Sequence, residues 1–275
     1  VPSMRAFVSA RAAGPSQGTV PFVGYGDFLP LASATAGPSI TRSILNARRL
    51  PSGCEALLTA ALAKLPLSSK NHLDVPLQLP SDGALHFLVS HPTPPAFDGA
   101  EDRNGRRNHD EIRLWADYLS PANAGHLVDD AGRRGGLDPA ASFVIAGDLN
   151  ADPNDGGSYD RAVLQLLDHP RVNAAVAMGA LRPASAGAQS ATARQGGANH
   201  GHGGEPAFDT ADFGDAGSDA PGNLRADYVL PSKDLQVCAS GVFWPTPEEP
   251  LWRLVNDDVR RSSDHRLVWI DIALP

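Results

Sequence analysis

One stretch of the sequence decides the fold: residues 142–153 read Ser142-Phe143-Val144-Ile145-Ala146-Gly147-Asp148-Leu149-Asn150-Ala151-Asp152-Pro153. An apolar, partly β-branched run ends in Gly and is followed by a carboxylate and a carboxamide two residues apart. Such a run, bounded by Gly and Pro, predicts a buried strand. Because side chains two apart on an extended backbone point to the same side, we expect Asp148 and Asn150 to project together from the strand end.

This Asp–Asn pair has two interpretations. An anion beside a neutral donor and acceptor suits a hard cation or the oxygens of a phosphoryl group. Asp and Asn are also common turn residues, so the pair could equally close the strand as a solvated Asx turn. The stretch alone does not decide between a site and a turn.

The length and charge of the chain limit the classes of function. With 275 residues it can bury the core of one domain, and we expect a single domain over residues 1–275, although residues 1–53 carry no motif. The formal net charge is −8, and no block of Lys or Arg is present. This argues against tight, sequence-independent binding to duplex DNA, so a nucleic-acid partner is possible but not favoured. Bound cations could still supply positive charge to a hydrolase.

The chain contains no apolar run of the roughly 18 residues that a membrane span needs. It begins with Val1 rather than Met, so we expect a processed or truncated N-terminus, which favours a secreted or periplasmic location slightly. Cys54 and Cys238 could pair or be free, and two Cys in a chain of this length do not reveal the redox compartment. The oligomeric state is open.

Strand and helix patterns alternate along the chain, which favours an α/β or α+β fold. Residues 84–90 predict a strand that ends abruptly at His91 before Pro92. Asn108 has the pattern of a helix N-cap, with Glu111 in the capping-box position. Further expectations are a helix over 55–65, a helix from 158 to 168, an irregular functional or mobile segment over 183–223, and closing strands over 225–230, 235–244 and 266–274.

The ends of four predicted strands carry polar side chains of one chemical type: His91, Asp148 with Asn150, Asp227, and Asp264 with His265. Imidazoles and carboxylates at one sheet edge suit metal-assisted phosphoester hydrolysis. A cation polarises the phosphoryl oxygen, and one His accepts a proton from water. A carboxylate beside an imidazole fixes its tautomer and raises its basicity.

Three segments resemble, in this order, motifs of the endonuclease/exonuclease/phosphatase superfamily: 147–153, 225–230 (Arg-Ala-Asp-Tyr-Val-Leu) and 262–266 (Ser-Ser-Asp-His-Arg). This deoxyribonuclease-I-like group also holds sphingomyelinases and inositol polyphosphate phosphatases. Ser90-His91-Pro92 resembles a fourth motif, a His that closes a central strand, and the resemblance covers about residues 66–275. It implies a four-layer αββα sandwich and phosphoester hydrolysis with Mg²⁺, Mn²⁺ or Ca²⁺.

The resemblance also implies roles for single residues. His265 resembles the general base of the family, Asp264 its partner or a metal ligand, and Asp227 an acid that orients a His. His91 resembles a second catalytic His that touches the phosphoryl oxygens.

Asp148 and Asn150 resemble the groups that orient the nucleophile and bind phosphate or metal. The polar loop after His91 and the His-rich segment near 200 suggest substrate contacts at Asn104, Arg103 and His200.

The sequence departs from the family pattern at its N-terminal side. The family normally supplies an Asn after its first strand and a metal-binding Glu after its second, and no Glu of this chain ends an apolar strand run. Three hypotheses follow. The chain is a metal-dependent phosphodiesterase or phosphatase, with an endonuclease as the alternative within this class. Alternatively, it is a catalytically incomplete domain that binds a phosphorylated ligand or a partner. A third possibility is a fragment whose missing strands come from another chain.

Overall fold

The computed structural model describes residues 3–8, 68, 70–79, 83–217, 220–255 and 262–273. The strands are β1 (Ser3–Val8), β2 (His72–Gln78), β3 (Ala84–Ser90), β4 (Ser142–Asp148), β5 (Ala211–Asp212), β6 (Asn223–Leu224), β7 (Asp227–Pro231), β8 (Val237–Phe243) and β9 (Leu267–Ala273). The α-helices are α4 (Arg103–Tyr118), α5 (Leu164–Leu167), α6 (Ala174–Ala177) and α7 (Ala186–Arg194). Short 3₁₀ turns are η2 (Ala124–His126), η3 (Tyr159–Arg161), η4 (Gly197–Gly201), η5 (Pro206–Phe208) and η6 (Pro250–Leu254).

The central element is a mixed four-stranded sheet in the order β2-β3-β4-β7. β3 and β4 are parallel and are connected through α4, whereas β2 and β7 run antiparallel to their neighbours. This arrangement brings the start of β2, the ends of β3 and β4, and the start of β7 to one edge of the sheet. The sheet confirms the expectation of an α/β fold.

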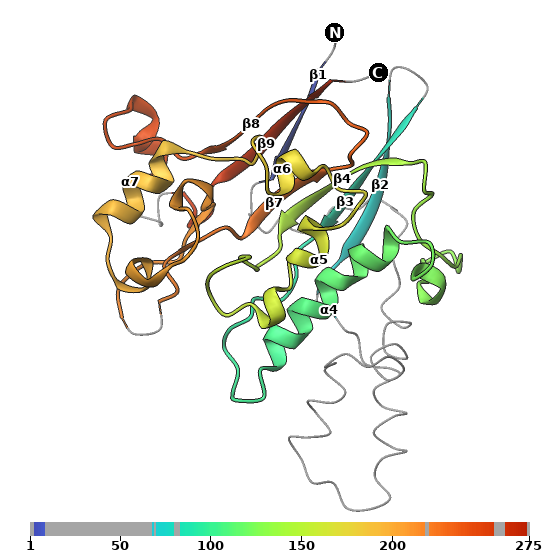
Figure 1. Ribbon diagram of the computed structural model, residues 1–275, viewed down its shortest axis with the longest axis horizontal. Coiled ribbons are helices and arrows are strands. Elements are labelled where there is room, and N and C mark those ends of the chain that lie inside the picture. The colour runs from blue at the N-terminus through green and yellow to red at the C-terminus, as the bar shows by residue number, and fades with distance from the viewer. Residues whose placement is uncertain are drawn as a thin grey trace, which may run out of the picture.

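A second sheet has the order β1-β9-β8, and all its pairs are antiparallel. Because β1 pairs with β9 from Ser3↔Ala273 to Val8↔Val268, the two ends of the chain lie side by side (Figure 1). The short strands β5 and β6 form a separate two-stranded ladder.

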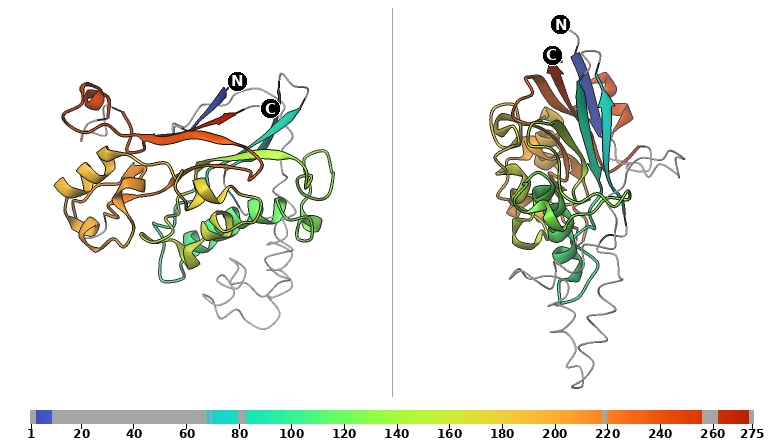
Figure 2. Two further views of the ribbon diagram at one scale, coloured as in Figure 1. Left: turned by 45° about the horizontal axis from the view of Figure 1, so that its top comes forward. Right: turned by 90° about the vertical axis from the view of Figure 1, so that its right-hand side faces the viewer.

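Two apolar clusters separate these elements. One lies between the two sheets and contains Leu85, Val144 and Val229 from the first and Val268 and Ile270 from the second. The other packs the opposite face of the four-stranded sheet against α4 and α5, which Figure 2 shows on the side away from β8 and β9. In β3, β4 and β7, residues on opposite faces of the sheet therefore enter different clusters, as the period of two requires.

Helix α4 forms because its apolar residues share one face. Ile112, Trp115 and Leu119 are fully buried, and the indole of Trp115 donates to Ser90 Oγ at 2.8 Å. The spacing of these three apolar residues in the sequence predicts one apolar helix face, and the structure confirms it. The predicted N-cap at Asn108 is wrong, because the helix begins at Arg103 with Asp102 in the cap position.

Other local predictions also need correction. Residues 158–168 contain two short turns of helix, η3 and α5, rather than one continuous helix, although Ser158 Oγ does accept a hydrogen bond from Ala162 N at 3.2 Å. Residues 183–223 are not irregular throughout, since they contain α7, η4, η5 and β5. The predicted strands over 84–90, 142–148 and the three closing segments are confirmed within one to three residues at their ends.

Two expectations lie partly or wholly outside the described residues. The helix over 55–65 and Cys54 belong to this group, whereas Cys238 is exposed and free. Within the described part of the chain, no helix is long and apolar enough to cross a membrane.

Candidate active site

The site begins with two carboxylates on neighbouring strands. Asp148 ends β4 and Asp227 begins β7, and the two residues are direct partners in the antiparallel register. Cross-strand partners point to the same face of a sheet. Both side chains are buried, with exposed fractions of 5% for Asp148 and 1% for Asp227. Two like charges therefore meet at one buried edge.

His265 reaches these carboxylates from the second sheet. It precedes β9 and forms an isolated antiparallel bridge with Ala211. Arg266 N donates to Thr210 O at 2.7 Å, and Asp212 N donates to Asp264 O at 2.7 Å. Backbone pairing with residues 210–212 thus fixes the segment that carries the imidazole.

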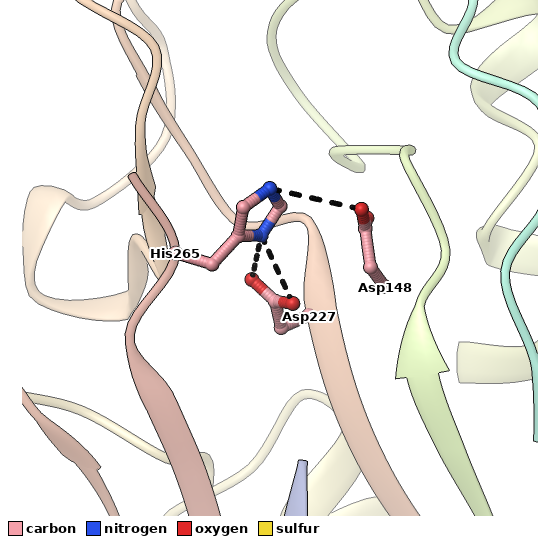
Figure 3. Close-up of side chains that lie close together, drawn as sticks. All are labelled: Asp148, Asp227 and His265. Carbon is pink, nitrogen blue, oxygen red and sulfur yellow. Dashed lines mark hydrogen bonds and ion pairs between the residues drawn. The ribbon is translucent and has the colours of Figure 1, made fainter. Parts of the chain in front are cut away.

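The imidazole lies between the two acids (Figure 3). His265 Nδ1 is 2.9 Å from Asp227 Oδ2 and 3.1 Å from Oδ1, while Nε2 is 3.7 Å from Asp148 Oδ2. Thr210 Oγ1 donates to Asp227 Oδ2 at 2.9 Å, and the Phe213 ring packs edge-on against the imidazole at 5.2 Å between centroids. Asp227 therefore fixes one nitrogen, and the other faces Asp148.

This proximity perturbs the ionisation of the whole group. Burial raises the pKa of Asp148 to about 7, and the neighbouring charge of Asp227 adds to the effect. Burial likewise raises the pKa of Asp227, against the hydrogen bond from His265. Burial opposes the charged form of His265, but the hydrogen bond and charge of Asp227, with the charge of Asp148, raise its pKa to about 9. Perturbed values of this kind concentrate at functional sites.

His91 completes the edge at the end of β3. Its Nε2 lies 3.3 Å from Asp148 Oδ2, and its side chain is 48% exposed. Burial lowers the pKa of His91 to about 4, and the charges of Lys70 and His265 act in the same direction. The imidazole is therefore neutral at neutral pH.

Gly147 makes the approach of His91 and Asp148 possible. Its φ is 157°, and a Cβ at this position would overlap the backbone carbonyl of Ser90. Only Gly allows the ends of β3 and β4 to come this close. The Gly that marked the strand end in the sequence is thus a condition of the site.

Asn150 does not extend the strand as expected. It has a φ of 51°, so the chain turns back after β4. Its backbone N donates to Asp148 Oδ1 at 2.8 Å, which is the Asx turn of the alternative interpretation, although Asp148 is buried rather than solvated. Its Nδ2 donates to Asp148 Oδ2 at 3.2 Å and to Pro92 O at 3.0 Å. Turn and site are therefore the same feature, and Asn150 holds the carboxylate of Asp148.

The remaining predicted residues are not members of the Asp148–Asp227–His265 group. The charge of Asp264 helps to raise the pKa of His265, and Asp264 Oδ1 accepts a hydrogen bond from Ser263 Oγ at 3.5 Å. Asn104 and Arg103 begin α4, and Asn104 Nδ2 donates to Ala96 O at 2.7 Å, which ties down the loop after His91. His200 is exposed in η4.

Sequence reasoning missed three residues beside the site. Thr210 and Phe213 come from the segment expected to be irregular, and Lys70 precedes β2 with a charge that lowers the pKa of Asp148 and His91. The polar Asp209-Thr210-Ala211-Asp212 run was a visible signal, but nothing local connected it to His265.

The residues of this group fit a divalent cation. One ligand atom each from Asp148, Asp227 and His265 lie within 4.8 Å of one another, and this is the one such group found among the described residues. Carboxylate oxygens and imidazole nitrogen are ligands of Mn²⁺ and Zn²⁺, and carboxylates alone suit Mg²⁺ and Ca²⁺. A cation would also offset the buried negative charge of the two acids.

Fold and site define an α/β protein with a carboxylate–histidine centre at the edge of a mixed sheet. The chain belongs to the endonuclease/exonuclease/phosphatase family, whose model matches residues 25–265. This confirms the resemblance inferred from the motifs and begins earlier than the expected residue 66. Members of the family are metal-dependent phosphoester hydrolases.

Comparison with solved structures gives distant similarities. An endonuclease/exonuclease/phosphatase from Beutenbergia cavernae DSM 12333 is 19% identical with a TM-score of 0.43, and the match covers 77% of this chain and 40% of that one. A 3'-5' exonuclease from Neisseria meningitidis is 16% identical (TM-score 0.34; 74% and 65% covered), and a sphingomyelinase C from Streptomyces griseocarneus is 14% identical (0.36; 75% and 59%). The chain spans less than two thirds of each. No curated protein matches significantly.

Proposed function

We propose that the protein is a divalent-metal-dependent phosphoester hydrolase in which His265 activates a water molecule. The observation that carries the proposal is the hydrogen bond between Asp227 and His265 Nδ1 at 2.9 Å. With Nδ1 protonated and bound to Asp227, the lone pair of neutral His265 lies on Nε2. That is the nitrogen on the side of Asp148, where a water molecule could lose its proton to it.

The charges around His265 control this base. Against burial, the hydrogen bond and charge of Asp227 and then the charge of Asp148 raise the pKa of His265 to about 9, so the imidazole is protonated at neutral pH and cannot accept a proton. Neutralisation of Asp148 by cation binding would remove part of that effect and return His265 toward its ordinary pKa. Cation binding at Asp148 would therefore favour the neutral imidazole that the proposed base needs.

We assign cation binding first to Asp148, because its carboxylate is oriented by Asn150 and is not the hydrogen-bond partner of His265 Nδ1. Asn150 and Asp264 stay proposed as further ligands. A divalent cation bound there would polarise a phosphoryl oxygen and offset the charge that develops on it. Neutral His91, half exposed beside Asp148, would donate a hydrogen bond to a phosphoryl oxygen.

The substrate class rests on charge. The net charge of −8 favours a small or lipid-like phosphoester over DNA. Asn104, Arg103 and His200 stay proposed as substrate contacts, because they belong to the polar loop after His91 and to the His-rich segment near residue 200. A single domain and a four-layer αββα sandwich are parts of the same proposal. The helix–sheet–sheet packing of the two cores supports the sandwich.

The test uses p-nitrophenyl phosphate and bis(p-nitrophenyl) phosphate with Mg²⁺, Mn²⁺ or Ca²⁺, and with chelator. We expect metal-dependent turnover that falls by roughly 10²–10⁴-fold in His265→Ala. Equal rates in this variant and the wild type, or no turnover with any metal, would overturn the proposal.

Two outcomes would favour the alternatives. Nicking of plasmid DNA with a higher kcat/KM than either aryl ester would identify an endonuclease. Cation binding by calorimetry without turnover would identify a catalytically incomplete domain, which the missing N-terminal Glu motif first suggested. The affinity of His265→Ala for Mn²⁺ distinguishes a base from a cation ligand. Loss of a proton acceptor leaves this affinity nearly unchanged, whereas loss of a ligand lowers it.

A further inference from the structure

Helix α4 carries two polar side chains that are fully buried. Asn108 and Glu111 both have an exposed fraction of 0%. They are three residues apart, so they share one face of the helix. This face meets the two loops that follow β3 and β4: the first begins with His91, and the second directly follows Asp148.

The side chain of Asn108 joins the two loops. Its Nδ2 donates to Thr93 O and to Leu149 O, both at 2.9 Å, and lies 3.4 Å from Asn150 O. An amide nitrogen has two hydrogens, so one bond can be made to each loop. Thr93 is two residues after His91, and Leu149 directly follows Asp148.

While Asn108 Nδ2 makes these bonds, the side-chain oxygen Oδ1 makes none with the described residues. Its Oδ1 is buried and has no hydrogen-bond partner in the described part of the chain. A buried acceptor without a partner costs free energy, so its presence needs an explanation beyond stability. The explanation offered by the contacts is geometric, because a single side chain sets the separation of two backbone segments.

Glu111 fixes the first of these loops a second time. Its carboxylate accepts a hydrogen bond from Thr93 N and another from Thr93 Oγ1 at 3.1 Å. Burial raises the pKa of Glu111. A buried acid costs free energy unless it is hydrogen-bonded. The hydrogen bonds to the Glu111 carboxylate come from Thr93, after β3, and from Ser68, before β2.

We propose that Asn108 and Glu111 are positioning residues that hold His91 and Asp148 at the distance the reaction needs. The inference rests on the proposed hydrolase function and adds residues that do not touch substrate or cation. His91 and Asp148 lie at the ends of separate strands, and the 3.3 Å between them is set by the loops that Asn108 bridges. A misplacement of about 1 Å in such a pair costs roughly 10²-fold in rate.

The main variant is Asn108→Ala, with Asn108→Leu as a second variant that restores the volume without the donors. The matched control is Asn173→Ala. Asn173 Nδ2 also donates to a backbone carbonyl, that of Leu235 at 3.2 Å, and its side chain caps α6. Asn173 N is bonded to Pro231 O, at the end of β7 away from Asp227.

We expect both Asn108 variants to lower kcat by roughly 10²-fold while KM changes little. Asn173→Ala should also lower the thermal midpoint, because the cap of α6 is lost, but should keep kcat close to that of the wild type. In a His91→Ala background, the loss of kcat caused by Asn108→Ala should be smaller than in the wild type, because part of its effect acts through His91. Additive losses, or an equal fall of kcat in Asn173→Ala, would reduce Asn108 to a purely structural residue.

Hydrogen exchange gives a readout that does not need activity. Asn108→Ala should speed exchange in both loop peptides, 91–97 and 149–152, whereas Glu111→Gln should speed it in 91–97 alone. Unchanged exchange in 149–152 of Asn108→Ala would overturn the bridge. If the wild type shows no turnover, the proposed function fails, and this experiment still decides whether the two loops are held together.

Discussion

Asp148 and Asp227 face each other directly across β4 and β7 as register partners, and both are buried. Like charges directly opposite on neighbouring strands are destabilising. The imidazole of His265 lies between them and offsets part of this charge, with contacts of 3.7 Å and 2.9 Å. A positive charge at this site is therefore stabilising. The expected effects of protons and cations follow from the direct opposition of Asp148 and Asp227.

The first prediction concerns the tautomer of His265. Asp227→Asn keeps the shape of the side chain but removes the charge that holds the proton on Nδ1. Because the neutral imidazole would then no longer present its lone pair reliably on Nε2, we expect kcat for an aryl phosphoester to fall roughly 10²–10⁴-fold. Steady-state kinetics with saturating Mn²⁺ measure this.

The chain contains a matched control for that variant. Asp74 binds His86 Nδ1 at 2.8 Å and Tyr118 OH at 2.6 Å, in a similar Asp–His pair on the β2–β3 ladder. His86 lies toward the start of β3, and His91 follows its end. Asp74→Asn should leave kcat near the wild-type value, so an equal loss in both variants would point to general destabilisation instead of a tautomer effect.

The second prediction is a fall of stability with pH in the metal-free protein. Because the pKa of His265 is raised from 6.5 to about 9, the folded state binds the proton more tightly than the unfolded state. Its contribution is fully present below pH 6.5 and is lost as pH rises through about 9. Urea unfolding at several pH values should therefore give a free energy of unfolding that declines over this window.

Other groups define where this test is clean. His91 and His72, whose pKa values are lowered to about 4, make stability rise with pH below 6.5 and so oppose the effect of Asp148 there. Above 6.5 both are neutral in either state. The pKa of Asp209 is raised to about 8, so its contribution to stability also falls as the pH rises, like that of His265. The control is therefore His265→Ala, whose free energy of unfolding should decline much less between pH 8 and 9.

The third prediction links cation binding to protons. Ligands that hold protons must release them when a cation binds. The pKa of Asp148 is raised to about 7, and a cation bound there would also disfavour the protonated form of His265, whose pKa is raised to about 9, so Mn²⁺ binding at pH 6.5 should release protons. Calorimetry in two buffers of different ionisation enthalpy should then give different observed enthalpies. Asp148→Asn should weaken binding by at least tenfold and reduce the proton release, and buffer-independent enthalpies in the wild type would contradict the assignment.

Much of the site was predictable because its signals are local. The strand ends at Asp148, Asp227 and His265 each follow or precede an apolar run, and sheet geometry brings such ends to one edge. The partner segment of His265 could not be predicted in this way. Thr210 and Ala211 pair with it from a Gly-rich region with few aliphatics, and only the folded chain brings the two together.

The error at Asn108 has a clear physical reason. Asn followed three residues later by Glu is a helix-start pattern, because both side chains can satisfy free backbone N–H groups. In the fold those side chains bind Thr93 and Leu149 instead, and the helix already begins at Arg103. Hydrogen bonds to distant segments of the chain therefore prevailed over the local capping preference of this pattern.

The Ala-rich helix α7 was missed for the opposite reason. Its low aliphatic content concealed a sequence with good helix propensity and a capping Ser185.

The last prediction tests the close approach of β3 and β4. Gly147→Ala places a Cβ against the backbone carbonyl of Ser90, at a φ of 157°. Backbone cannot move aside as a flexible side chain can, so we expect the free energy of unfolding to fall by about 1–3 kcal/mol or more. The strand ends must also separate, which should lower kcat because His91 and Asp148 move apart. Gly125→Ala is the control, as no atom lies within 4 Å of the added Cβ. Denaturant unfolding and kinetics on both variants decide the matter: a Gly147→Ala protein with the stability and kcat of Gly125→Ala would show that the two strand ends do not need this glycine.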